Sequence, residues 1–141
     1  MNSRKRCRGG SVLEGALFLP WFIFLFIGAL DWGFYAHALI STQNAARVAA
    51  LYTSTSSTTA ADSTTACQYA LGQLKTSVNI GTLSTCNGLP LIVTAAKVTG
   101  PDGQEASEVV VTYQTTRLIP IPGLLAGQAT IRRVCQMPLR S

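Results

Sequence analysis

The chain has 141 residues, 48% of them hydrophobic and only 12% charged. Its formal net charge is +5, but four of the eleven positive side chains lie within the first eight residues, where no acid is present. Residues 9–141 carry seven positive and six negative side chains, a net charge of +1, so the composition does not indicate a nucleic-acid-binding surface. The length allows one small domain plus an anchor.

The first predicted element is a membrane-spanning helix. Between Glu14 and Asp31 lie sixteen uncharged residues. A span from Glu14 through Tyr35 measures about 33 Å at about 1.5 Å per residue, enough to cross a hydrocarbon core of roughly 30 Å. We therefore expect a basic leader at 1–9 and a transmembrane helix at 10–35. Because positive residues beside an apolar helix stay cytoplasmic, the leader predicts a single pass with the amino terminus inside.

The helical pattern continues beyond the predicted membrane span. Residues 36–52 are rich in alanine and keep Leu39, Ala46 and Ala50 on one side of a helix. Span and continuation predict one helix of about 40 residues, or roughly 60 Å. Residues 53–65 are almost entirely serine, threonine and alanine, which predicts a flexible linker with little to bury.

The remaining residues, 66–141, predict an extracytoplasmic α+β domain. A short amphipathic helix is expected over 66–78, with Cys67, Ala70, Leu71, Leu74 and Val78 on one face. Residues 91–98 are apolar and β-branched, residues 107–116 alternate, and the turn at 99–103 between them predicts a hairpin. Residues 128–136 predict a third strand. The expected fold is pilin-like: a long amino-terminal transmembrane-plus-amphipathic helix packed on a small antiparallel sheet with a short second helix.

The four cysteines fall on two sides of the predicted membrane. Cys7 lies in the cytoplasmic leader, and Cys67, Cys86 and Cys135 lie outside, where disulfides form. We predict a local Cys67–Cys86 disulfide, which leaves the role of Cys135 open. The chain has no CxxC spacing and one histidine, so we expect no metal site and no cofactor.

No catalytic constellation is present. His37 is the only histidine and lacks candidate partners nearby, and no phosphate-binding or dinucleotide-binding motif occurs, so we expect a protein that is not an enzyme. Glu14 stands out, because a carboxylate at the mouth of an apolar helix is costly if it enters hydrocarbon. It can favour the helix dipole. It can also pair with a positive charge on another chain, such as the free amino group of a neighbouring subunit.

The amino-terminal motif resembles a known processing site. Gly9, followed by Gly10-Ser11-Val12-Leu13-Glu14, is similar to the site of the type IV prepilin peptidase, which cuts after the glycine and leaves Glu as the fifth mature residue. A cut after Gly10 would make Glu14 the fourth. Further residues resemble the TadE-like minor pilins of tight-adherence (Flp-type) pili: Glu14-Gly15-Ala16-Leu17-Phe18-Leu19-Pro20, Gly28, Asp31-x-Gly33, and Ala45-Ala46-Arg47 with Ala49-Ala50. Gly15 departs from the Phe or Tyr usual after this Glu.

The resemblance implies a function in pilus biogenesis and adhesion. Its expected partners are other pilins, the assembly machinery, the prepilin peptidase and the bacterial inner membrane, with Glu14 acting in assembly and Pro20 kinking the membrane helix. Two alternatives stay open. The protein is secreted after signal-peptide cleavage behind Ala36-His37-Ala38, or it is a single-pass scaffold of a secretion apparatus that enters no fibre.

Overall fold

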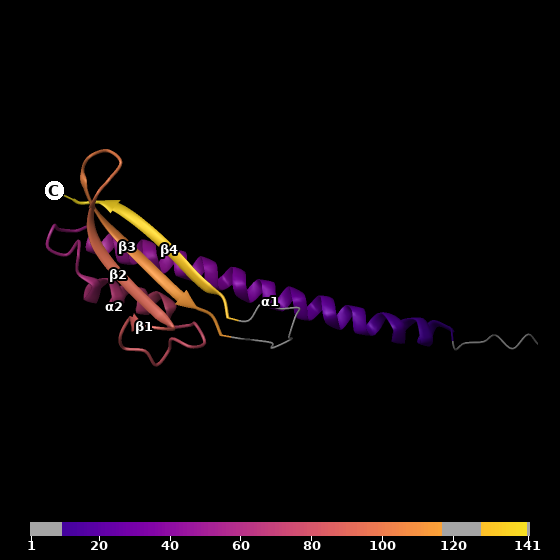
Figure 1. Cartoon of the computed structure of the whole chain (residues 1–141). Coiled ribbons are helices and arrows are strands. Elements are labelled where there is room, and N and C mark those ends of the chain that lie inside the picture. Colours follow the sequence, from indigo (N-terminus) through magenta and orange to yellow (C-terminus); the bar gives the residue numbers. More distant parts are fainter. Residues whose placement is uncertain (1–9, 117–127, 141) are drawn as a thin grey trace, which may run out of the picture. The chain divides into compact units, whose positions relative to one another are not determined.

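The computed structural model describes residues 10–116 and 128–140 (Figure 1). The elements are, in order, α1 (Gly10–Thr53), α2 (Ser63–Leu74), β1 (Asn87–Gly88), β2 (Leu91–Thr99), β3 (Glu105–Gln114) and β4 (Thr130–Pro138). Two compact units divide the chain, Met1–Phe34 and Tyr35–Ser141, and α1 contributes residues to both. The predicted α+β class and the long continuous first helix are confirmed.

The sheet of the second unit is antiparallel, with strand order β1-β2-β3-β4. The predicted hairpin is present as β2 and β3, and its turn contains Gly103 at φ 78, a conformation that glycine adopts without a steric penalty. The third predicted strand is β4, which begins and ends two residues later than expected. Strand β1 was not predicted, because a two-residue strand at an Asn-Gly pair carries no alternating pattern and reads as a turn.

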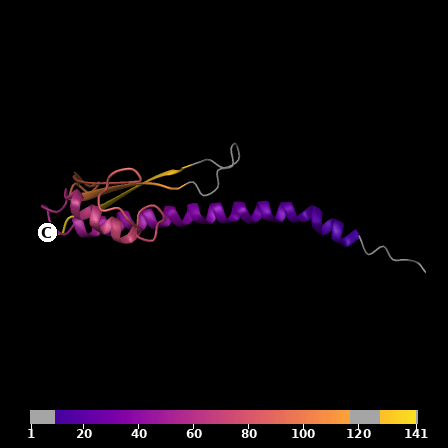
Figure 2. The same cartoon turned by 90° about the horizontal axis from the view of Figure 1, so that it is seen from below.

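Alternate residues of the strands face a core shared with helical residues 38–53. Val93, Val111 and Ile131 are buried with neighbours on the same sheet face, and the helical side of the core is formed by small side chains. The buried helical residues recur at helical spacing: Ala38, Thr42, Ala45, Ala46, Ala49, Ala50 and Thr53. Figure 2 shows α2 and the end of α1 on one side of the sheet. Small side chains at these contacts let the helix backbone approach closely.

Helix α2 begins three residues before the predicted start and ends four before the predicted end. Asp62 caps it, since the Asp62 carboxylate accepts hydrogen bonds from the backbone N–H groups of Thr64 and Thr65. The prediction that Val78 lies on the buried helix face is wrong: it follows the helix and is 70% exposed. The rings of Tyr52 and Tyr69 stack with centroids 3.8 Å apart, which joins α2 to the end of α1.

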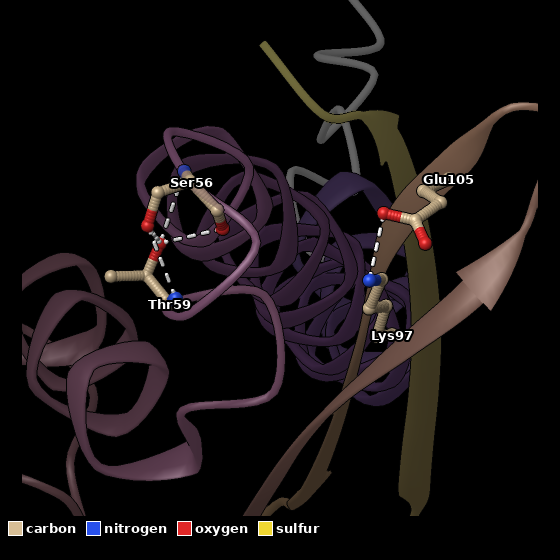
Figure 3. A network of polar contacts seen from close by, with 4 residues as sticks. All are labelled: Ser56, Thr59, Lys97 and Glu105. Atoms are coloured by element: carbon tan, nitrogen blue, oxygen red, sulfur yellow. Dashed lines mark hydrogen bonds and ion pairs between the residues drawn. The ribbon is translucent and has the colours of Figure 1, made fainter. Parts of the chain in front are cut away.

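The serine- and threonine-rich segment buries more than the linker prediction allowed. Ser56 and Thr59 bond each other through backbone and hydroxyl groups, as Figure 3 shows. Ala60 is fully buried, and its carbonyl accepts a hydrogen bond from the Ser107 hydroxyl of β3. Short hydroxyl side chains satisfy nearby backbone groups, so the segment forms hydrogen-bonded turns without large apolar residues.

Candidate functional site: the amino-terminal helix

The first half of α1 exposes large apolar side chains around its whole circumference. Among the exposed residues are Leu17, Phe18, Leu19, Trp21, Phe22, Ile23, Phe24, Leu25 and Phe26, each at least half exposed. A soluble protein rarely leaves such a continuous apolar surface in water. Within the described part of the chain, α1 is the one helix long and apolar enough to cross a membrane. The first half of α1 is therefore suited to lipid or to a partner helix of equal polarity.

Glu14 lies one turn into this helix and its side chain is exposed. The one ion pair formed by described residues joins Lys97 and Glu105, so Glu14 has no cationic partner within the described part of the chain. The carboxylate is the first charge of the described helix and is followed by sixteen uncharged residues. Pairing of the Glu14 carboxylate with a positive charge on another chain stays a prediction.

The predicted processing and kink residues stand at the start of this helix. Gly9 and the rest of the leader lie outside the described residues, while Gly10 is the first residue of α1. Pro20 lies inside α1, which remains helical on both sides of it although proline supplies no N–H for the helical hydrogen bond. Figure 2 shows the helix axis changing direction within its indigo segment. Assignment of that bend to Pro20 remains a prediction.

The structure joins Cys67 and Cys86, the pair predicted from the sequence, by a disulfide with Cα atoms 5.7 Å apart. The bond links α2 to the residue just before β1, the short edge strand that pairs with β2. Cys135 is a free, half-buried cysteine on β4. Burial raises the pKa of the Cys135 thiol, and the positive charge of Arg47 partly opposes that rise.

A Lys97–Glu105 ion pair lies at the turn end of the hairpin, on β2 and β3, with N···O 2.7 Å (Figure 3). Both side chains are exposed, so the pair contributes little to stability. It does not belong to the candidate site.

The sequence interpretation missed two polar interactions of the second unit, the Asp62 cap of α2 and the Thr53–Ser107 hydroxyl pair. The Asp62 cap had a readable signal, because Asp62 is followed at once by Ser63-Thr64-Thr65 and an amphipathic run. The buried hydroxyl pair of Thr53 and Ser107, 2.8 Å apart, had none, since it joins residues 54 positions apart.

The described chain thus combines a long apolar helix, compatible with a single membrane span, with a small α+β unit. Residues 9–51 match the family model described as TadE-like protein, which confirms the resemblance over this part of the chain. The match includes Gly9, Glu14, Pro20 and the alanine-rich continuation of α1. No curated protein and no solved structure matches the chain.

Proposed function

We propose that this chain is a membrane-anchored minor pilin or pilus-assembly protein of a tight-adherence (Flp-type) pilus and acts without catalysis in pilus biogenesis and adhesion. The observation that carries the proposal is the match over residues 9–51, combined with a helix whose apolar side chains are exposed on all sides. Such a helix needs lipid before assembly and other apolar helices after it.

The proposed order of events follows the chain. The basic leader holds the amino terminus in the cytoplasm, and the single span of the inner membrane places the second unit outside. A prepilin peptidase cuts after Gly9. Glu14 then pairs with the new amino group of a neighbouring pilin, and a bend at Pro20 helps the helix leave the bilayer. The Cys67–Cys86 disulfide is consistent with an outer, oxidising location for the second unit.

Mass spectrometry of the protein from purified pili and from the membrane fraction tests processing. We expect an amino terminus at Gly10 and peptides of this chain in the fibre. A chain that keeps Met1 and occurs only in the membrane would instead be the single-pass scaffold of a secretion apparatus. An amino terminus at Leu39 would show signal-peptide cleavage, but Ala38 is buried in the core and α1 continues through it, which favours retention of this segment.

The docking role of Glu14 has a matched control in Asp31, the other carboxylate of α1. We expect Glu14→Gln to reduce incorporation into pili at least tenfold, because the uncharged amide cannot form the ion pair with the neighbour's amino group. Asp31→Asn makes the same chemical change near the far end of the apolar stretch and should leave incorporation within about twofold. Equal incorporation of both variants would rule out the proposed pair, provided that membrane levels are equal.

A further inference from the structure

The two edges of the sheet differ in how their backbone groups are satisfied. On the β2 edge, β1 pairs with Leu91 and Ile92, the Val93 N–H donates to the Cys86 carbonyl and the Ala95 N–H donates to the Ser63 hydroxyl. These contacts cover most of the β2 edge. The other edge is β4, a nine-residue strand whose only partner in the described part of the chain is β3.

The register shows which β4 groups face away from the sheet. Leu139 donates to the Glu105 carbonyl and Thr115 donates to the Ala129 carbonyl, so the odd-numbered residues of β4 exchange hydrogen bonds with β3. The backbone N–H and C=O groups of Arg132, Val134 and Gln136 therefore point outward. No hydrogen bond within the described residues reaches them. A row of this kind is a template for another strand.

The surroundings of this edge are basic. Arg132 and Arg133 lie on β4, and the charge of Arg47, on α1, acts on the β4 thiol of Cys135. None of these arginines takes part in an ion pair with a described residue. The Nε atom of Arg133 is buried and has no hydrogen-bond acceptor in the described structure. An arginine that only protected a sheet edge from aggregation would keep its N–H donors in contact with water. The Arg133 Nε is instead shielded from water and has no acceptor among the described residues, which is energetically unfavourable.

The acidic side chains of the second unit either interact with other groups or lie in the turn of the hairpin, so none of them neutralises the arginines near the β4 edge. Asp62 caps α2, Glu105 pairs with Lys97, the Glu108 carboxylate accepts from the Gln136 side chain, and Asp102 lies in the turn between β2 and β3. Strand β4 itself contains no acid. Pairing of β4 with the β4 of a second copy would bring two basic strands together without a compensating charge. Carboxylates that neutralise this basic edge would therefore belong to a protein of different sequence.

We propose that the outer edge of β4 binds an extended acidic segment of a partner protein, which adds a fifth strand to the sheet. Main-chain hydrogen bonds to Arg132, Val134 and Gln136 supply affinity, and carboxylates on the two faces of the added strand meet Arg132 on one side and Arg133 with Arg47 on the other. This inference goes beyond the proposed function and does not depend on cleavage at Gly9.

The test uses the full chain in detergent micelles and a labelled nine-residue peptide of alternating valine and threonine with two central glutamates. A second peptide carries two lysines at those positions. We expect the glutamate peptide to bind at least tenfold more tightly than the lysine peptide by fluorescence anisotropy. On binding, amide hydrogen exchange of Arg132, Val134 and Gln136 should slow at least tenfold, while Cys135, already bonded to β3, changes little.

Two variants at one position isolate the backbone contribution. Val134→Pro removes one outward N–H and leaves the β3–β4 hydrogen bonds intact, and proline is tolerated on edge strands. Val134→Ala removes the same side chain but keeps the N–H. We expect the proline variant to bind the glutamate peptide at least tenfold more weakly than the alanine variant, with both folded by circular dichroism.

Several outcomes would overturn the proposal. They are equal binding of the two peptides, or equal affinity of the two folded Val134 variants. Slow exchange of the outward amides in dilute protein alone would mean that the chain covers its own edge. Slowing that grows with protein concentration would identify a second copy as the occupant. If the proline variant does not fold, the exchange of the unsubstituted chain still decides between these results.

Discussion

The two halves of α1 share the α-helical backbone conformation but differ in the side chains that they expose and bury. Residues 12–32 present leucine and aromatic side chains on every side, and these side chains are exposed. Residues 35–53 instead bury a stripe of alanine and threonine and leave Asn44 and Arg47 exposed. The first half carries an apolar surface compatible with a membrane span, whereas the second half is a specific packing element of a small domain.

The difference shows that helix propensity alone says little about the role of a segment. Large apolar side chains in the first half are suited to a lipid environment. Small side chains in the second half allow close contact with the sheet, where added side-chain atoms have little room. The first two predictions below separate these two environments by making the same substitution in both halves of α1.

The largest effect is expected from a charge in the first half. Leu25→Arg should disfavour membrane insertion by roughly 2.5–3.5 kcal/mol, because the guanidinium would enter the hydrocarbon core. Leu51→Arg makes the same change in the second half, where the side chain is 45% exposed, and should leave insertion unchanged. Carbonate extraction of membranes measures both. Equal membrane retention of the two variants would contradict the division of α1 into a lipid-facing and a packed half.

The next effect comes from overpacking of the alanine stripe. Ala49 is fully buried, so Ala49→Leu should destabilise the second unit by about 2 kcal/mol, since the added atoms displace the sheet or the helix. Ala29→Leu is the control, because Ala29 is exposed in the first half of the helix. Urea unfolding followed by tyrosine fluorescence measures the free energy of unfolding. A loss for Ala29→Leu as large as that for Ala49→Leu would show that the stripe is not a packing surface.

Much of this contrast was predictable from the sequence, and the reasons are local. The uncharged run after Glu14 specifies a long apolar helix by its length. The alanine-rich continuation and the alternation at Val109, Val111 and Tyr113 are periodic patterns, and each specifies an element and its buried face. The Cys67–Cys86 pair was predictable because the bond closes a local loop.

Features that depend on tertiary contact were not predictable. Nothing local distinguishes Ala60, which is fully buried, from its neighbour Ala61, which is exposed. The outward row of β4 and the buried Nε of Arg133 become visible only once the strand order is known. The candidate processing site differs from these features, because the motif alone predicts Gly9 and this residue lies outside the described residues.

A smaller effect is expected from the buried hydroxyls that join the second half of α1 to the sheet. The Ser107 hydroxyl lies 2.8 Å from that of Thr53 and donates to the Ala60 carbonyl at 3.0 Å. Ser107→Ala should cost roughly 1 kcal/mol of unfolding free energy, because it leaves a buried carbonyl without its donor. Ser57→Ala, at an exposed position, should be neutral in the same urea titration. A neutral Ser107→Ala would mean that water replaces the lost donor.

The smallest effect concerns the start of α2, a short helix that lacks the apolar length of α1 and depends on its cap. The Thr65 hydroxyl, then the backbone N–H groups of Thr65 and Thr64, hold the pKa of Asp62 below its ordinary value. The ionised carboxylate therefore stabilises the folded state. That contribution is complete above the unfolded pKa of about 3.9 and is lost as pH falls through the lower folded value. In thermal unfolding from pH 6 to pH 2, Asp62→Asn should lose less stability than the unsubstituted chain, because asparagine caps a helix without titrating. Parallel melting curves for the two chains over this range would show that the charge of Asp62 does not contribute to the cap.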